Sequence, residues 1–285
     1  MPAAGGLLLP ATTRMASRTK QKEEARARRL AEEQAEADRT QRQRRMFMLG
    51  GVLLLAVAVV AVAIAISSSG SSSTAGSAAA TPKTPQQHQQ QTQISRQVNG
   101  LLAGLPQSGN ALGSPRAPVT VTEFGDLECP VCRDFALTSE NQLISNEVKA
   151  GKVKLLYKSL QTATQDPATF GVQQAAALAA GKQNKSWNFI LLFYHEQGAE
   201  GTGYVNAGYL AGLAQQIPGL KFTQWQTDTR NPTLLAQVQA DENSAQAQGF
   251  TATPSITIQG PKGPAPPIVG PPSYSDLQAR IKQVS

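Results

Sequence analysis

Two cysteines separated by two residues are the part of this chain best suited to chemistry. They are Cys129 and Cys132, in the segment CPVC, and the chain has two cysteines in total. At this spacing on a helix both sulfurs lie on one face, with Cα atoms within the roughly 4.4–6.8 Å that a disulfide permits. A cysteine at a helix N-terminus is stabilised as the thiolate by unpaired N–H groups and the helix dipole. We therefore expect Cys129 to be the nucleophile and Cys132 the resolving thiol in thiol–disulfide exchange.

Three other uses of a CxxC pair compete with redox chemistry. A structural disulfide that encloses two residues removes little entropy from the unfolded chain and stabilises weakly. A zinc site needs four ligands, whereas this sequence has no second CxxC and only two histidines, His88 and His195. An inert reduced pair is disfavoured outside the cytoplasm. Redox chemistry is the interpretation that these residues favour, and we expect neither a metal nor a prosthetic group.

Strands and helices on both sides of the motif must position it. The segment 119–124 alternates with period two and predicts a strand, while Pro130 suits the first turn of a helix. We expect this helix over 133–149, a second strand over 153–160, a third over 255–259 and a last helix over 274–284. Between the second and third strands we expect four helices, at 166–181, 186–195, 206–217 and 232–248. This order of elements predicts an α/β fold.

A long apolar run predicts a membrane anchor. Residues 46–66 are 21 residues without a charge, and at about 1.5 Å per residue they span roughly 30 Å, the hydrocarbon thickness. Four arginines lie in 39–45 and the next basic residue is Lys83, so the positive-inside rule places the N-terminus in the cytoplasm. A cleaved signal peptide that ends near 78–80 is the alternative. We expect a single-pass protein of the cell membrane whose CxxC faces an extracytoplasmic, disulfide-permissive compartment.

The distribution of charge follows the same topology. Of the net charge of +7, residues 1–45 contribute 11 Lys and Arg against six Asp and Glu, and the remainder contributes 15 against 13. An extended nucleic-acid footprint on the folded part is therefore not expected. We divide the chain into a charged cytoplasmic segment (1–45), a transmembrane helix (46–66), a flexible Ser/Ala/Gln-rich linker (67–97) and one folded domain (98–285), with a helical insertion at about 164–249.

The folded domain resembles the DsbA-like thiol-disulfide oxidoreductases of the thioredoxin superfamily, of the membrane-anchored bacterial type. The resemblance is strongest over 112–133, which includes VTEFGDLECPVC, and it covers about 98–285. It implies a thioredoxin-like fold with a helical insertion. It also implies a cis-proline loop at Thr253 and Pro254 that faces the cysteines, and a buried acid at Glu123 that assists proton transfer. The implied partners are protein substrates with cysteines and a membrane redox partner.

Val131 departs from the strongest oxidants of this family, which carry His between the proline and the second cysteine. Valine cannot stabilise a thiolate, so we expect a less oxidising disulfide. The alternative functions are a disulfide reductase or isomerase kept reduced by a membrane donor, and a non-catalytic binding module. Glu128 would oppose thiolate formation if its carboxylate lies close to Cys129. Asp126 is interpreted as a turn residue, and His195 as a packing or capping residue.

Overall fold

The computed structural model describes residues 85–285. The charged segment, the predicted transmembrane helix at 46–66 and the linker up to residue 84 lie outside the described residues. Within 85–285, no helix combines the length and the apolar character needed to cross a membrane.

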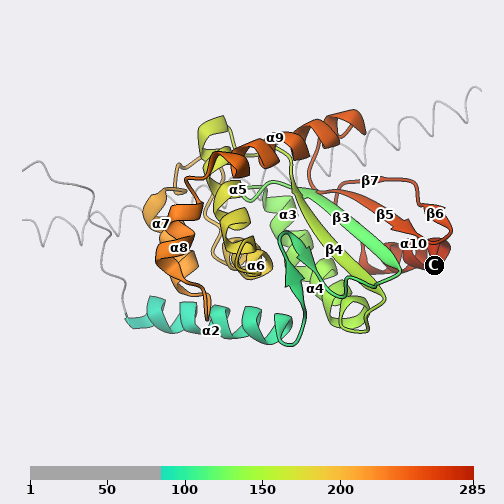
Figure 1. Ribbon diagram of the computed structural model, residues 1–285, viewed down its shortest axis with the longest axis horizontal. Coiled ribbons are helices and arrows are strands. Elements are labelled where there is room, and N and C mark those ends of the chain that lie inside the picture. The colour runs from blue at the N-terminus through green and yellow to red at the C-terminus, as the bar shows by residue number, and fades with distance from the viewer. Residues whose placement is uncertain (1–84) are drawn as a thin grey trace, which may run out of the picture. The chain divides into compact units, whose positions relative to one another are not determined.

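The described chain begins with helix α2, Pro85–Leu102, drawn in teal in Figure 1. This helix replaces the last part of the flexible linker that composition predicted up to residue 97. It buries Val98 and Leu102 and packs against helix α6, Ser186–His195. The polar, Gln-rich composition did not indicate order, because a surface helix is stabilised mainly by the element against which its few apolar residues pack.

A seven-stranded sheet forms the centre of the domain. Its order is β1-β2-β4-β3-β5-β6, and β7 also pairs with β5. Strand β3 is parallel to β4 and antiparallel to β5. The strands are β1 (Gln107–Ser108), β2 (Ala111–Leu112), β3 (Val119–Gly125), β4 (Val153–Ser159), β5 (Ser255–Gly260), β6 (Gly263–Pro264) and β7 (Ile268–Val269). The three long strands are those that the sequence predicts, whereas the two-residue strands carry too few residues to show a period.

Strand β3 is buried along almost its whole length, so its two faces point into different packing clusters. Phe124 packs edge-on against Phe250 in a small cluster on one face. Glu123 points to the opposite face, where its Cα partners across the sheet are Tyr157 and Ile256. That second face belongs to the main core, which also contains both cysteines. Strand alternation therefore directs the carboxyl of Glu123 toward the interior behind the CxxC motif.

The helix that follows the motif is continuous but irregular. It consists of α3 (Pro130–Phe135), the π-helical turn η1 (Ala136–Glu140), α4 (Asn141–Leu143) and a second π-helical turn η2 (Ile144–Val148). The sequence predicts one helix here and gives no sign of the two wide turns. A π-turn holds one more residue than an α-turn and is frequent at functional sites.

Five helices lie between β4 and β5, in the stretch assigned to the insertion. They are α5 (Pro167–Gly181), α6, α7 (Ala207–Gln215), α8 (Phe222–Asp228) and α9 (Pro232–Ala247). Figure 1 shows α5 to α8 grouped beside the sheet, with the C-terminal helix α10 (Tyr274–Val284) at the opposite end. The side chains of Asp166 and Asn231 cap α5 and α9. Helix α8 was not predicted, and its buried Trp225 donates a hydrogen bond to the Ala176 carbonyl at 2.9 Å.

Candidate active site

Cys129 is the N-cap residue of α3. Its backbone is extended, Pro130 occupies the first turn, and the Cys132 backbone N–H donates to the Cys129 sulfur at 3.4 Å. The Cys132 thiol lowers the pKa of Cys129 to about 6 by hydrogen bonding to its sulfur. Burial opposes this shift, while the Thr253 side chain and the N–H groups of Cys132 and Val131 add to it. The sulfur of Cys129 is therefore largely a thiolate at neutral pH, as a nucleophile requires.

Cys132 has the opposite character, although it lies one helical turn away. Its side chain has no exposed area. Burial raises its pKa well above the usual range, and the hydrogen bond to Cys129 and the charge of Glu123 raise it further. Cys132 is thus held as a thiol at neutral pH. Both cysteines are free in this structure.

The loop that precedes β5 closes over Cys129. The peptide bond between Thr253 and Pro254 is cis, as the resemblance implied. When Cys129 is protonated, its thiol donates a hydrogen bond of 3.7 Å to the carbonyl oxygen of Thr253. The hydroxyl of Thr253 is hydrogen-bonded to that of Thr162, in the loop that follows β4. Two segments that are 124 residues apart in the chain therefore meet at the nucleophilic sulfur.

Asp126 organises these loops and is more than the turn residue that the sequence suggested. It is fully buried. One carboxylate oxygen accepts hydrogen bonds from the backbone N–H groups of Thr162, Ala163 and Thr164 at 3.0, 2.9 and 2.8 Å. The other accepts from the Thr164 hydroxyl at 2.6 Å and from the Glu128 N–H at 3.1 Å. Asp126 thereby fixes Thr162 next to Thr253 and acts on Cys129 through that contact.

The insertion also holds the active-site turn. The side-chain amide of Gln197, which follows α6, donates to the carbonyl oxygens of Leu127 and Cys129 at 2.7 and 3.2 Å. The hydroxyl of Tyr194 donates to the Asp126 carbonyl at 3.4 Å. Sequence reasoning missed both residues. A polar side chain 68 residues from its partner leaves no signal in spacing or composition.

Glu123 occupies the interior position that the resemblance implied. It is 2% exposed, no N–H or hydroxyl group donates to either of its carboxyl oxygens, and its hydrogen-bonding neighbour is the carboxyl of Glu140. Burial raises its pKa well above the usual range, with further contributions from the neighbouring carboxyl of Glu140 and the charge of Cys129. Glu140 is buried as well, and burial also raises its pKa. This second acid was not singled out from the sequence, because nothing local distinguishes it from an exposed helical glutamate.

Glu128 is buried, so it does not point to solvent. Burial raises its pKa, whereas a hydrogen bond with Thr164 opposes that rise. His195 is half-buried at the end of α6, and burial, assisted by the charge of Arg133, lowers its pKa. These two residues therefore border the site without contributing charge that stabilises a thiolate.

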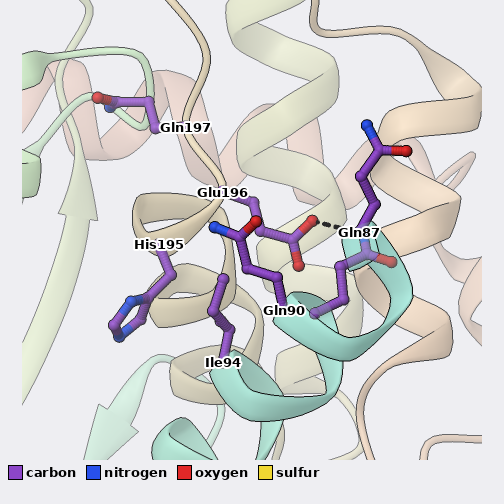
Figure 2. Close-up of a pocket in the computed structure, with 7 residues that line it drawn as sticks. Gln87, Gln90, Ile94, His195, Glu196 and Gln197 are labelled. Atoms are coloured by element: carbon purple, nitrogen blue, oxygen red, sulfur yellow. Dashed lines mark hydrogen bonds between the residues drawn. The ribbon is translucent and has the colours of Figure 1, made fainter. Parts of the chain in front are cut away.

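A polar pocket of about 330 Å³ lies between α2 and the end of α6 (Figure 2). Its lining residues are Gln87, Gln90, Gln91, Ile94, His195, Glu196 and Gln197. Figure 2 shows Gln197 directed away from the other lining side chains, consistent with its bonds to the active-site turn. Among residues 85–285, no group of three or more His, Cys, Asp or Glu is arranged to hold a metal ion.

Comparisons with known proteins match the part of the chain that carries this site. The family model described as Thioredoxin matches residues 107–283, a range that includes both cysteines and the cis-proline loop. Over 153 residues the chain is 28% identical to a probable disulfide bond formation protein D of Bacillus cereus, which covers 53% of this chain and 69% of that protein. It is 26% identical over 171 residues to disulfide bond formation protein D of Bacillus subtilis, covering 58% and 74%.

Two solved structures share the architecture. BdbD from Bacillus subtilis, in its oxidised form, aligns with a TM-score of 0.54 and 23% identity, covering 64% of this chain and 96% of that one. A thioredoxin-like oxidoreductase from Silicibacter pomeroyi aligns with a TM-score of 0.50 and 25% identity, covering 65% and 95%. The described domain therefore has the fold of these proteins over nearly their whole length.

Proposed function

Because the chain belongs to the thioredoxin family and is a DsbA-like protein thiol-disulfide oxidoreductase, we propose that it exchanges disulfides with secreted or envelope proteins through Cys129 and Cys132. The observation that carries this proposal is the difference in acidity between the two sulfurs. Cys129 has a pKa of about 6, whereas burial holds Cys132 as a thiol. In such a pair, Cys129 attacks or leaves readily, and Cys132 remains a thiol until it resolves the mixed disulfide.

In the oxidising direction a substrate thiolate attacks the Cys129 sulfur of the Cys129–Cys132 disulfide. The bond between the two cysteine sulfurs breaks, its electron pair goes to Cys132, and Cys132 takes up a proton. The second substrate thiolate then attacks the substrate sulfur of the mixed disulfide, and Cys129 leaves as a thiolate. Two electrons pass from the substrate dithiol to the protein. The low pKa of Cys129 makes it a good leaving group in this last step.

Thr253 and Pro254 form the substrate-facing wall in this proposal. The Thr253 carbonyl lies 3.7 Å from the Cys129 sulfur, so a peptide joined to that sulfur must pass beside this loop. Pro254 has no backbone N–H, which leaves the loop without a donor at that position. Glu123 is proposed to exchange a proton with Cys132, because its carboxyl is buried and interacts with the Cys132 sulfur.

The direction of electron flow in the cell is proposed to be oxidative. The Cys129 pKa of about 6 lies between the values of about 3.5 for DsbA and about 7 for thioredoxin, so the disulfide is expected to be an intermediate oxidant. A reductase or isomerase kept reduced by a membrane donor is the second candidate. It is favoured by Val131, which is 43% exposed and offers no side-chain donor to the thiolate.

The proposal also places the domain outside the cytoplasm, on a membrane anchor at 46–66. It rests on the uncharged apolar run and on the arginines that precede it, which together favour an anchor with its N-terminus inside. In intact cells, external protease is expected to digest the domain. Alkaline extraction is expected to leave the chain in the membrane fraction. Release of a shortened chain by alkaline extraction would instead indicate a cleaved signal peptide.

Trapping of substrates tests the redox function. In a Cys132→Ser variant the mixed disulfide at Cys129 cannot be resolved, so adducts with other proteins are expected to accumulate and to disappear on reduction. The matched control is Cys129→Ser, which keeps a buried cysteine but no accessible thiolate and is expected to yield none. Absence of adducts in Cys132→Ser, together with no thiol-oxidising activity of the intact protein, would identify a non-catalytic binding module. The redox state in cells, measured by alkylation mass shift, separates oxidase from reductase.

A further inference from the structure

Glu140 is a buried acid that disulfide exchange as described leaves unused. It is 1% exposed, and one of its carboxyl oxygens has no hydrogen-bond partner. It is the last residue of the π-helical turn η1, two turns beyond Cys132. A carboxyl group without hydrogen bonds or a cation is costly to bury in its charged form. Its place in this interior therefore requires an explanation.

The two acids lie on β3 and η1, and the groups that face them come from α3 with its N-cap, β4 and α6. Glu123 on β3 interacts with Glu140 and with Cys129 on α3. Tyr157 on β4 and Tyr194 on α6 interact with Glu123 and with Cys132. Among the described residues, the titratable groups of this cluster are carboxyls, thiols and phenols, with no Lys, Arg or His.

The cluster is closely packed around Glu123. A Cβ atom added at Gly125 would lie 2.8 Å from the Tyr157 ring and 3.1 Å from a carboxyl oxygen of Glu123. The Tyr157 ring and the Glu123 carboxyl therefore both pack closely against the backbone of Gly125. Two neighbouring carboxyls without solvent or a cation cannot both be ionised at neutral pH, so they retain at least one proton between them.

We propose that Glu140 is a positioning residue for the dithiol chemistry: when Glu123 gives its proton to Cys132, the Glu140 carboxyl shares with Glu123 the proton that remains on the pair, and Glu123 takes a proton back when the disulfide re-forms. This inference rests on the proposed function for the exchange partner, a protein thiol or disulfide. Glu140 does not touch the sulfurs and acts through Glu123. It keeps Glu123 protonated to a higher pH than a single buried acid would be.

The proton and electron balance is as follows for opening of the disulfide. The substrate thiolate forms a bond to Cys129, the bond between the cysteine sulfurs breaks, and its electron pair resides on Cys132. The Glu123 carboxyl gives its proton to Cys132, and the carboxyl pair, which starts with two protons, keeps one and gains one negative charge until a second proton returns from solvent. When the disulfide re-forms, the Cys132 thiol returns a proton to Glu123. The Cys132 sulfur then attacks Cys129, and the partner sulfur departs with the electron pair.

The test is a Glu140→Gln substitution in the full-length chain, which removes the second acid but keeps the shape of the side chain. Infrared spectroscopy of the protonated carboxyl C=O band would follow the two acids as the pH is varied. We expect two coupled steps in the unsubstituted protein. In the variant we expect one step, shifted to lower pH by about one unit. Over the same pH interval, the variant is also expected to open its disulfide with a dithiol more slowly at high pH than the unsubstituted protein does.

Two controls separate proton sharing from a structural role. Asp134→Asn removes an exposed acid from α3 and is expected to leave both pH profiles unchanged. In a Glu123→Gln background, adding Glu140→Gln is expected to cause no further shift in the rate profile. An unchanged carboxyl titration in Glu140→Gln, or a rate shift that persists without Glu123, would overturn the proposal.

A third measurement covers the case in which the variant does not fold. The carboxyl titration of the unsubstituted protein must then show two coupled steps, and two independent steps at ordinary carboxyl values would overturn the proposal. Failure of the proposed function is distinguishable, because it appears as missing adducts in Cys132→Ser. The infrared titration of the two acids needs no substrate.

Discussion

The surroundings of the two active-site sulfurs differ in how their polar groups are satisfied. Around Cys129, the polar groups of four loops are hydrogen-bonded: Asp126 accepts five hydrogen bonds, Thr253 pairs with Thr162, and Gln197 binds two carbonyls. Around Cys132, one turn deeper, no N–H or hydroxyl group donates to Glu123, whose neighbour is a second carboxyl.

This difference explains why one helical turn separates a thiolate from a thiol. Hydrogen bonds to a charged group favour its charged form, whereas burial without partners favours the neutral form. The helix dipole acts on Cys129 at the N-cap and weakens within the first turn. The surroundings of Cys129 thus stabilise a negative charge, and the surroundings of Cys132 keep the buried groups protonated. Disulfide exchange needs both, because one sulfur must depart as an anion and the other must be protonated.

The largest effect is expected from removing the centre of the outer network. An Asp126→Ala substitution leaves at least three backbone N–H groups without an acceptor, which should cost about 3–5 kcal/mol in the free energy of unfolding. It should also raise the pKa of Cys129, because Thr253 loses its fixed position. Urea unfolding measures the first effect. Asp134→Ala, on the exposed side of α3, is the control, with a change of about 0.5 kcal/mol or less. A loss below about 1 kcal/mol for Asp126→Ala would show that the network does not depend on this carboxylate.

The second largest effect is expected from a change of pH in the reduced protein, where the two sulfurs should differ in reactivity. Alkylation of Cys129 is expected to fall about tenfold for each pH unit below its pKa, whose value is about 6. Cys132 should remain unmodified at neutral pH.

The pKa of Cys129 is lower in the fold than in the unfolded chain, so its thiolate stabilises the reduced fold at high pH. This contribution is lost as the pH falls through about 6. Mass spectrometry of the two cysteines, with calorimetry of the reduced and oxidised proteins, measures both effects. Equal labelling of both cysteines would show that their sulfurs do not differ in acidity.

The smallest of the three effects is expected from adding a donor beside Cys129. A Val131→His substitution should lower the Cys129 pKa by about one unit and raise the reduction potential by about 30 mV. Equilibration with glutathione measures the potential, and Val131→Thr provides a neutral control of similar size. The unsubstituted protein is expected between about −270 and −120 mV, the values of thioredoxin and DsbA. A potential near −120 mV without the histidine would mean that the loops alone make a strong oxidant.

Much of the fold could be predicted from local patterns. The strands at 119–125, 153–159 and 255–260 and the helices α5, α6, α9 and α10 agree with the expected elements, because each has a clear period or a capping residue. Helix α8, the π-turns and the helical part of the linker were not predicted. These elements depend on packing against distant segments, as the burial of Trp225 illustrates.

For the active site, the sequence by itself determined the type of chemistry: two cysteines at CxxC spacing, a proline at the first helical position and a strand before them. The tertiary structure decided how acidic each sulfur is. That acidity depends on Asp126, Thr162 and Gln197, which meet only after folding, and on Glu140, which the irregular helix places beside Glu123. Electrostatic interactions act through space between groups that are remote in the chain, so no local pattern could have disclosed them.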